Sequence, residues 1–147
     1  MNNLVIVNQG RSSCGKSNSI RRVWELLLEK YPKTSNLIMD DGDVKATVKI
    51  GDVLVGIESQ GDPKSRMFES LEEFMKMGCN IIVIPCRTSG RTYQVVADLN
   101  EEYGWDFMYC QNERYWGENE DEVRDMLNQQ YAEQVVRLIE DRIAGRI

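Results

Sequence analysis

The chain has 147 residues, 41% of them hydrophobic, with a formal net charge of −6 and an isoelectric point near 4.8. A chain of this size buries one core, so we expect residues 1–147 to form a single domain. The acidic balance argues against a protein that binds nucleic acid or an anionic membrane surface, because both attract basic surfaces.

Two further absences restrict the location of the protein and the side chains that could serve in catalysis. No apolar run approaches the roughly 18 residues of a membrane span, and no basic leader precedes the first apolar residues, so we expect a cytoplasmic protein. The chain has four cysteines and no histidine, which excludes imidazole catalysis and predicts reduced thiols rather than a disulfide framework or a zinc site. Proton transfer must therefore use carboxylates, lysine, tyrosine or water.

The first third of the chain predicts a strand, a glycine loop and a helix. Residues 4–7 form a β-branched run typical of a strand that is buried on both faces. Apolar residues at helical spacing then predict a helix over residues 15–30, which Pro32 ends. A weaker strand is expected at 36–39, followed by a turn at 40–43.

The rest of the chain continues the alternation of strands and helices. Two apolar runs flank Gly51-Asp52 and predict a β-hairpin, whose second strand is the more apolar and therefore the more central. Further helices and strands follow, with glycines closing two of the helices. The expected elements are strands at 46–50, 53–57, 81–84 and 107–110 and helices at 65–77, 92–103 and 120–143.

This order predicts an α/β fold: a three-layer α/β/α sandwich around a mostly parallel sheet, with one antiparallel strand supplied by the hairpin. In such sheets ligands collect at the carboxyl ends of the strands. Functional residues are therefore expected just after Val7, Ile57 and Ile84.

The segment after the first strand fits the pattern G-x-x-x-x-G-K-[ST] at every position: Gly10, Arg11, Ser12, Ser13, Cys14, Gly15, Lys16 and Ser17. It follows a buried strand and opens a helix, which is the context that phosphate binding requires. Its glycines let backbone N–H groups surround an anion, and the helix start adds free N–H groups and a positive dipole end.

Through this segment the chain resembles the P-loop NTPase superfamily, from the N-terminus to about Gly90. The resemblance implies a bound nucleoside triphosphate, with Gly10, Gly15 and Lys16 on the phosphates and Ser17 on Mg²⁺. Residues 11–14 would contribute mainly backbone N–H groups. Cys14 has two interpretations, a passive small residue or an oxidation-sensitive thiol at a helix start.

An acidic segment follows the strand at 53–57. Mg-nucleotide sites need a carboxylate, usually at the end of a strand beside the P-loop strand, and Glu58 and Asp62 are the candidates. Glu58-x-x-Gly61 resembles the Asp-x-x-Gly segment of GTPases, which implies Glu58 as a metal ligand. Asp62 is the candidate proton acceptor. The alternative is a polar turn whose acids are only solvated.

The base preference follows from the strand at 81–84. In a GTPase this strand would be followed by Asn-Lys-x-Asp, but Pro85-Cys86-Arg87-Thr88 stands there, so ATP or a relaxed base preference is favoured over GTP. Arg87 or Arg91 is a candidate for stabilising transferred phosphate charge. Alternatively, residues 89–92 cap the next helix or bind an acceptor anion there.

The C-terminal third offers surfaces rather than a motif. Six aromatic residues between positions 103 and 116 form either a stacking surface for adenine or ordinary core and edge packing. The C-terminal helix carries an apolar stripe that either covers the sheet or forms a homodimer interface.

Together these features predict an Mg-dependent, ATP-binding P-loop NTPase that hydrolyses or transfers the terminal phosphoryl group. Lys16, Asp62 and Arg87 are the expected catalytic residues. Two alternatives stay open: a small-molecule or nucleotide kinase, and a nucleotide-dependent switch with little turnover.

Overall fold

The computed structural model describes residues 1–9, 16–61, 66–86 and 91–147, without the side chains of residues 16, 17, 91 and 92. Strands and helices alternate along this part of the chain, apart from three consecutive strands between residues 35 and 58, and every element expected from the sequence is present. The elements are β1 (Leu4–Gln9), α1 (Lys16–Lys30), β2 (Ser35–Asp40), β3 (Val44–Ile50), β4 (Val53–Glu58), α2 (Met67–Lys76), β5 (Ile81–Cys86), α3 (Arg91–Tyr103), β6 (Asp106–Tyr109) and α4 (Glu120–Ile143).

The strands form one sheet in the order β2-β3-β4-β5-β1-β6. β1 pairs in parallel with both β5 and β6, and β4 pairs in parallel with β5. β3 is antiparallel to both of its neighbours, β2 and β4. The predicted mostly parallel sheet with one antiparallel hairpin strand is therefore confirmed, and so is the more central position of β4.

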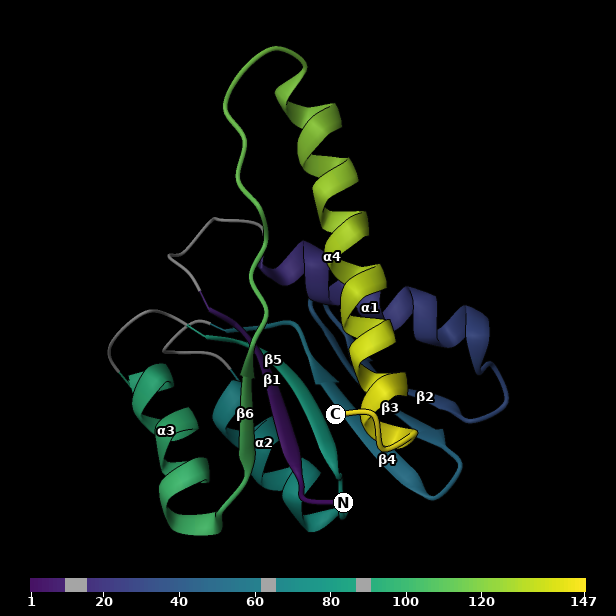
Figure 1. Ribbon diagram of the computed structural model, residues 1–147, viewed down its shortest axis with the longest axis vertical. Helices are drawn as coiled ribbons and strands as arrows, with labels where there is room; N and C mark the ends of the chain where they lie inside the picture. The colour runs from purple at the N-terminus through teal and green to yellow at the C-terminus, as the bar shows by residue number, and fades with distance from the viewer. Residues whose placement is uncertain (10–15, 62–65, 87–90) are drawn as a thin grey trace.

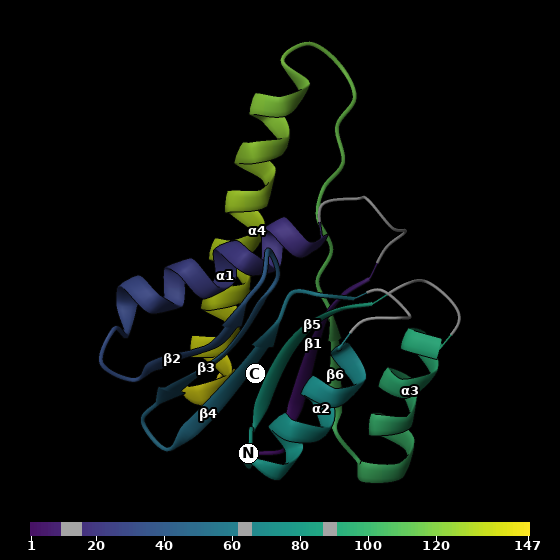
Figure 2. The same ribbon diagram turned by 180° about the vertical axis from the view of Figure 1, so that it is seen from behind.

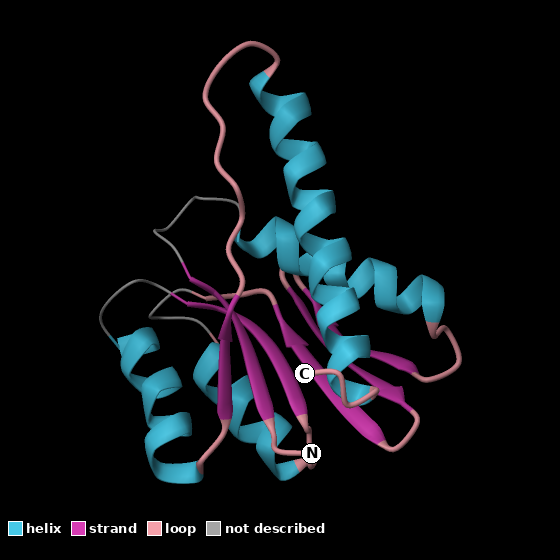
Figure 3. Ribbon diagram, in the orientation of Figure 1, coloured by secondary structure: helices cyan, strands magenta, loops and turns pink. Residues whose placement is uncertain are grey.

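Helices cover both faces of the sheet, as Figures 1 and 2 show from opposite sides. Side chains alternate between the faces along a strand, so Leu4 and Ile6 pack toward α1 and α4, whereas Val5 and Val7 pack toward α2 and α3. The result is the predicted three-layer arrangement, which Figure 3 shows by element type.

Glycines with positive φ close the turns that the sequence predicted. Gly51 (φ 60°) lies in the β3–β4 hairpin turn, and Gly78 (φ 82°) and Gly104 (φ 69°) follow α2 and α3. A side chain in this left-handed region is strained. These residues fix where each helix ends and the next strand begins.

The helix α4 has two different halves. Its second half lies on the sheet and buries Tyr131, Ala132, Val135, Val136 and Ile139. Its first half projects beyond the sheet beside the segment that follows β6 (Figure 1). The second half of the apolar stripe therefore covers the sheet, as in the first of its two interpretations, while Met126 in the first half is 53% exposed. None of the described helices is long and apolar enough to cross a membrane.

Candidate functional site

The carboxyl ends of four strands meet at one edge of the sheet. Gln9 at the end of β1 pairs with Cys86 at the end of β5, and Ile57 of β4 is level with Val83 of β5. The parallel pairing of β1 with β6 brings Tyr109 to the same edge. The segments that the sequence singled out all leave from this edge, as expected for a ligand site in a parallel sheet.

The order of the strands corrects one expectation. The acidic strand was expected beside the strand of the glycine loop, but β5 lies between β1 and β4. The reason is that β5 pairs in parallel with both of them and is buried along its whole length. Glu58 is thus one strand further from the glycine loop than predicted.

The G-x-x-x-x-G-K-S segment starts directly after β1. β1 ends at Gln9 and α1 begins at Lys16, so the described part confirms the strand before the segment and the helix after it. Residues 10–15 and the side chains of Lys16 and Ser17 lie outside the described residues. The same holds for Asp62 and for Arg87 and the residues up to Gly90.

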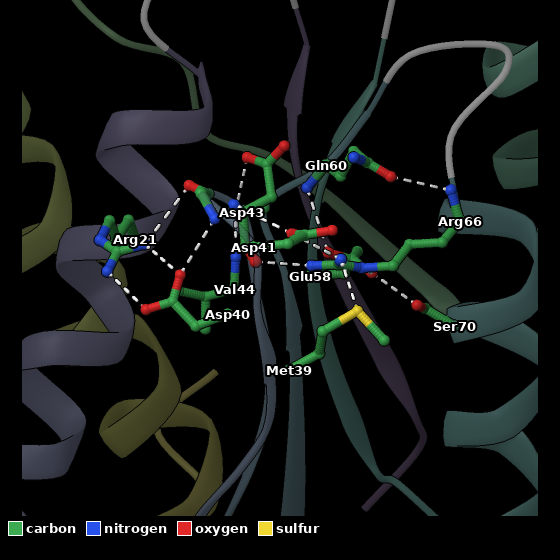
Figure 4. A network of polar contacts seen from close by, with 12 residues as sticks. Arg21, Met39, Asp40, Asp41, Asp43, Val44, Glu58, Gln60, Arg66 and Ser70 are labelled. Carbon is green, nitrogen blue, oxygen red and sulfur yellow. Dashed lines mark hydrogen bonds and ion pairs between the residues drawn. The ribbon is translucent and has the colours of Figure 1, made fainter.

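Glu58 is fully buried at the end of β4, and three donors satisfy its carboxylate. Oε1 accepts hydrogen bonds from Nε of Arg66 at 2.8 Å and from Oγ of Ser70 at 2.5 Å. Oε2 accepts the backbone N–H of Gln60 at 3.2 Å. A buried carboxylate needs such partners, because isolation in a low-dielectric interior costs several kcal/mol. In this structure Glu58 anchors α2 to the sheet (Figure 4).

Arg66 joins Glu58 to the turn between β2 and β3. Its Nη1 forms an ion pair with Oδ1 of Asp41 at 2.7 Å, and its Nη2 donates to the backbone oxygen of Asp43 at 2.6 Å. Burial lowers the pKa of Arg66, but its hydrogen bonds to Glu58 and Asp41 outweigh this effect and the pKa is raised. The guanidinium therefore stays charged and ties three segments of the carboxyl edge together.

A second arginine reaches the same turn from α1. Nη1 and Nη2 of Arg21 donate to the two carboxylate oxygens of Asp40 at 3.0 and 2.7 Å. This hydrogen bonding lowers the pKa of Asp40, with a further contribution from the N–H of Gly42. We call Arg21, Asp40, Asp41, Asp43, Glu58 and Arg66 the edge network. It links the helix that opens at Lys16 to the β2–β3 turn and to the start of α2.

Gly61 has a structural role beside the one that the GTPase resemblance implies. A Cβ at this position would lie 2.5 Å from Cγ of Pro85, which is shorter than any normal contact. Glycine therefore lets the segment after β4 pass close to the end of β5. This contact brings the acidic segment against the strand that neighbours β1.

Polar side chains also meet beneath the end of β1. The amide of Asn8 donates to Oδ1 of Asn112 at 2.5 Å, and the amide of Asn112 donates to Oδ1 of Asn128 at 2.9 Å. Ser19 donates to the same oxygen of Asn128 at 3.1 Å. We call these four residues the asparagine cluster. It connects the strand and helix on either side of the glycine loop to the segment after β6 and to the projecting half of α4.

Sequence reasoning missed the edge network and the asparagine cluster. Arg66 and Asn112 belong to no motif, and their partners are distant in sequence. The local signals were weak. Asn8 is a polar residue at the end of an apolar, buried strand, and Arg66 directly precedes an apolar helix. Neither signal names a partner, so the pairing becomes visible only in three dimensions.

The aromatic residues of the C-terminal third do not gather into one surface. Trp105 is buried under α3 in the core, whereas 71% of Trp116 is exposed on the projecting segment. Phe107 and Tyr109 pack together with ring centroids 5.4 Å apart. The described aromatics thus favour core and edge packing over a common adenine-stacking surface.

The three described cysteines, Cys79, Cys86 and Cys110, are buried and form no disulfide with one another. Burial raises the pKa of Cys79 to about 12 and also raises the pKa of Cys110. Within residues 1–9, 16–61, 66–86 and 91–147, no three Cys, Asp or Glu side chains are grouped as a metal site would need. Glu58 therefore belongs to no such group among the described residues, and the side chain of Ser17 lies outside them.

The structure is an α/β domain with a mixed six-stranded sheet, and polar segments gather at the carboxyl ends of its strands. No protein-family model, curated protein or solved structure matches the chain.

Proposed function

We propose that the chain is a P-loop NTPase that binds Mg-ATP at residues 10–17 and hydrolyses or transfers its terminal phosphoryl group. The observation that carries this proposal is the position of the glycine segment. It joins the carboxyl end of β1, which lies between two parallel neighbours, to the first residue of α1. A phosphate loop requires this strand-to-helix connection, because the helix start supplies free N–H groups to the anion.

Lys16 and Ser17 take the roles that the pattern gives them. Lys16 neutralises charge on the terminal phosphates, and Ser17 is a ligand of the metal. When bound, Mg²⁺ supplies charge neutralisation and orientation of the phosphate oxygens. The position of both residues in the first turn of α1 supports these roles.

The role of Glu58 in the proposal is weaker than the sequence indicated. Its two oxygens already accept three hydrogen bonds, and its ion pair with Arg66 occupies Oε1. Direct metal binding by Glu58 would have to use Oε2, because Oε1 already accepts bonds from both Arg66 and Ser70. We therefore propose that Glu58 holds the edge network in place, and that Asp62 is the acid that serves the metal or accepts the proton of an attacking water.

Arg87 completes the proposed catalytic set as the cation that stabilises charge on the transferred phosphoryl group. It directly follows Cys86, the last residue of β5, and β5 is the neighbour of β1. This adjacency supports the role, because the residue leaves the sheet next to the strand of the glycine loop.

Two alternatives to an ATPase are possible: a kinase, which has a different phosphoryl acceptor, and a switch, which has a much lower turnover rate. A kinase would transfer the phosphoryl group to a small molecule at the same edge. A switch would bind nucleotide tightly and turn over slowly, and the asparagine cluster gives this alternative a specific basis. Asn8 precedes the loop and Asn112 leads into the projecting segment, so a change at the loop has a direct polar connection to that segment.

Turnover assays separate the three activities. Purified protein is incubated with Mg-ATP or Mg-GTP, alone and with a panel of small hydroxyl acceptors, and released phosphate and ADP are quantified. Phosphate release without acceptor indicates an ATPase, acceptor-dependent ADP formation indicates a kinase, and binding with negligible turnover indicates a switch. Equal turnover by the protein and by its Asp62→Asn variant would remove Asp62 from the mechanism.

A further inference from the structure

The strand β2 forms one open edge of the sheet and exposes apolar side chains along it. It pairs only with β3, at the end of the strand order. Leu37, Ile38 and Met39 are 47%, 40% and 43% exposed, although the neighbouring strand β3 is almost entirely buried. Exposed, apolar edge strands are surfaces that pair with another strand.

The backbone of β2 also offers unused hydrogen-bonding groups to such a strand. The N–H of Lys49 donates to the oxygen of Thr34 at 3.0 Å, so Thr34 bonds toward β3. Backbone groups in an antiparallel ladder alternate in direction. The N–H and C=O groups of Ser35 and Leu37 therefore point away from β3, toward the open edge.

Charge along this edge is arranged for antiparallel pairing with an identical strand. The exposed Lys33 precedes β2, and the exposed Asp41 follows it. An antiparallel pairing centred on Leu37 places Leu37 opposite its own copy and brings the turn that carries Lys33 in each chain toward the turn that carries Asp41 in the other. Opposite charges across a strand pair are stabilising, whereas like charges are not.

We propose that two copies of this chain associate through β2, antiparallel and centred on Leu37, to form one continuous sheet. This interface is separate from the one suggested by the C-terminal helix, whose second half is buried in its own chain. The proposed interface does not depend on nucleotide binding. β1 lies near the opposite end of the sheet, so the dimer leaves the segment after β1 uncovered by β2.

An irregularity in β2 limits how far the pairing extends. The register with β3 shifts between Leu37 and Met39, which leaves Ile38 as an extra residue on β2. Such bulges twist an edge and shorten the ladder that it can form. The predicted interface is therefore small and closed by its two-fold symmetry, and it should dissociate at about micromolar concentrations.

Sedimentation over a range of concentrations tests the proposal. We expect the wild-type protein to shift from monomer to dimer between about 1 and about 200 µM, the range of a small, weak interface. Leu37→Lys should weaken the dimer by about tenfold or more, because it places two like charges on the symmetry axis. Met126→Lys is the matched control, since Met126 is 53% exposed on α4, and it should dimerise like the wild type.

Cross-linking tests the register and does not depend on the stability of the lysine variant. Opposed residues in an antiparallel pair have Cα atoms about 5.5 Å apart, which a disulfide can bridge. In a Cys14→Ser background, Leu37→Cys should give a covalent dimer on mild oxidation, whereas Met126→Cys should not. A wild-type protein that stays monomeric throughout, or a dimer that Leu37→Lys leaves intact, would overturn the proposal.

Discussion

The buried carboxylate of Glu58 and the guanidinium of Arg66 lie 2.8 Å apart, on opposite sides of the segment that carries Asp62. This ion pair changes the interpretation of the acidic segment. The sequence offered Glu58 as a metal ligand, but in the structure it holds the start of α2 against the end of β4. The pair thereby joins the end of β4 to the start of α2, the two elements that residues 62–65 connect along the chain.

Removal of Arg66 should lower the free energy of unfolding far more than removal of an exposed arginine. Arg66→Met leaves Glu58 buried without its charged partner, and breaking a buried pair in this way costs about 3–5 kcal/mol. The measurement is the urea midpoint and slope of unfolding. Arg146→Met removes a much more exposed ion pair to Asp141 and serves as the control, with an expected cost of about 0–1 kcal/mol. Equal losses in the two variants would contradict the anchoring role of Glu58.

The asparagine cluster should couple stability to nucleotide binding. Asn112→Ala removes the acceptor of Asn8, which is 1% exposed, and an unsatisfied buried amide costs about 1–3 kcal/mol. Because Asn8 lies two residues before Gly10, we also expect weaker Mg-ATP binding. Gln111→Ala, at an exposed neighbouring position, is the control and should change neither quantity. Unfolding midpoints and calorimetric titrations measure the two effects, and normal affinity in a destabilised Asn112→Ala variant would refute the coupling.

Stability should fall in acid, and the ion pair of Lys30 with Glu140 should account for part of that fall. Nζ of Lys30 donates to both oxygens of Glu140 at 2.7 Å, which lowers the pKa of Glu140 from its ordinary value of 4.5. A carboxyl with a lowered pKa in the folded state stabilises the fold above its unfolded pKa. That contribution is lost as the pH falls through the unfolded and then the folded pKa.

The test of this pH dependence is a series of urea midpoints from pH 6 down to pH 3, a window chosen around the ordinary carboxyl pKa. Lys30→Met should make the decline shallower, because Glu140 then keeps a more ordinary pKa. Lys76→Met, which removes an exposed i,i+4 pair with Glu72, should leave the slope close to that of the wild type. A Lys30→Met slope as steep as the wild-type slope would show that the pair does not contribute.

Thiol labelling should report on the glycine loop through Cys14. The other three cysteines are buried, and the raised pKa values of Cys79 and Cys110 make their thiolates scarce and slow to react. Iodoacetamide should therefore modify the native protein mainly at Cys14, as peptide mass spectrometry would reveal. Bound Mg-ATP should slow that reaction, and an unchanged rate at saturating nucleotide would count against binding at this segment.

The sequence predicted the elements of the fold well because their signals are local. Buried β-branched runs marked β1 and β5, and Gly51 and Gly78 marked a turn and a helix end. Their burial and positive φ values confirm those signals. The strand order was harder, since nothing in the sequence of β5 shows that it separates β1 from β4.

The candidate site was only partly predictable for the same reason. The G-x-x-x-x-G-K-S pattern is contiguous and could be found by inspection, whereas the edge network unites Arg21 and Arg66 with acids from two other segments. Glu58 illustrates the limit: the sequence placed it just after a strand that in fact ends with it, and its partners Arg66 and Ser70 come from the start of α2. Long-range pairing decides whether such an acid faces a ligand or an arginine.

The most direct test of the account is calorimetric titration of Mg-ATP into the wild-type protein, Lys16→Met and Lys76→Met. Lys16 is the lysine of the proposed phosphate loop, and Lys76 is an exposed lysine at the end of α2. We predict saturable binding to the wild type and to Lys76→Met, and binding at least about tenfold weaker to Lys16→Met, since one charge-assisted hydrogen bond contributes about 1.5–3 kcal/mol. No binding to the wild type, or equal affinity in all three proteins, would contradict the proposal that this chain is a P-loop nucleotide-binding protein.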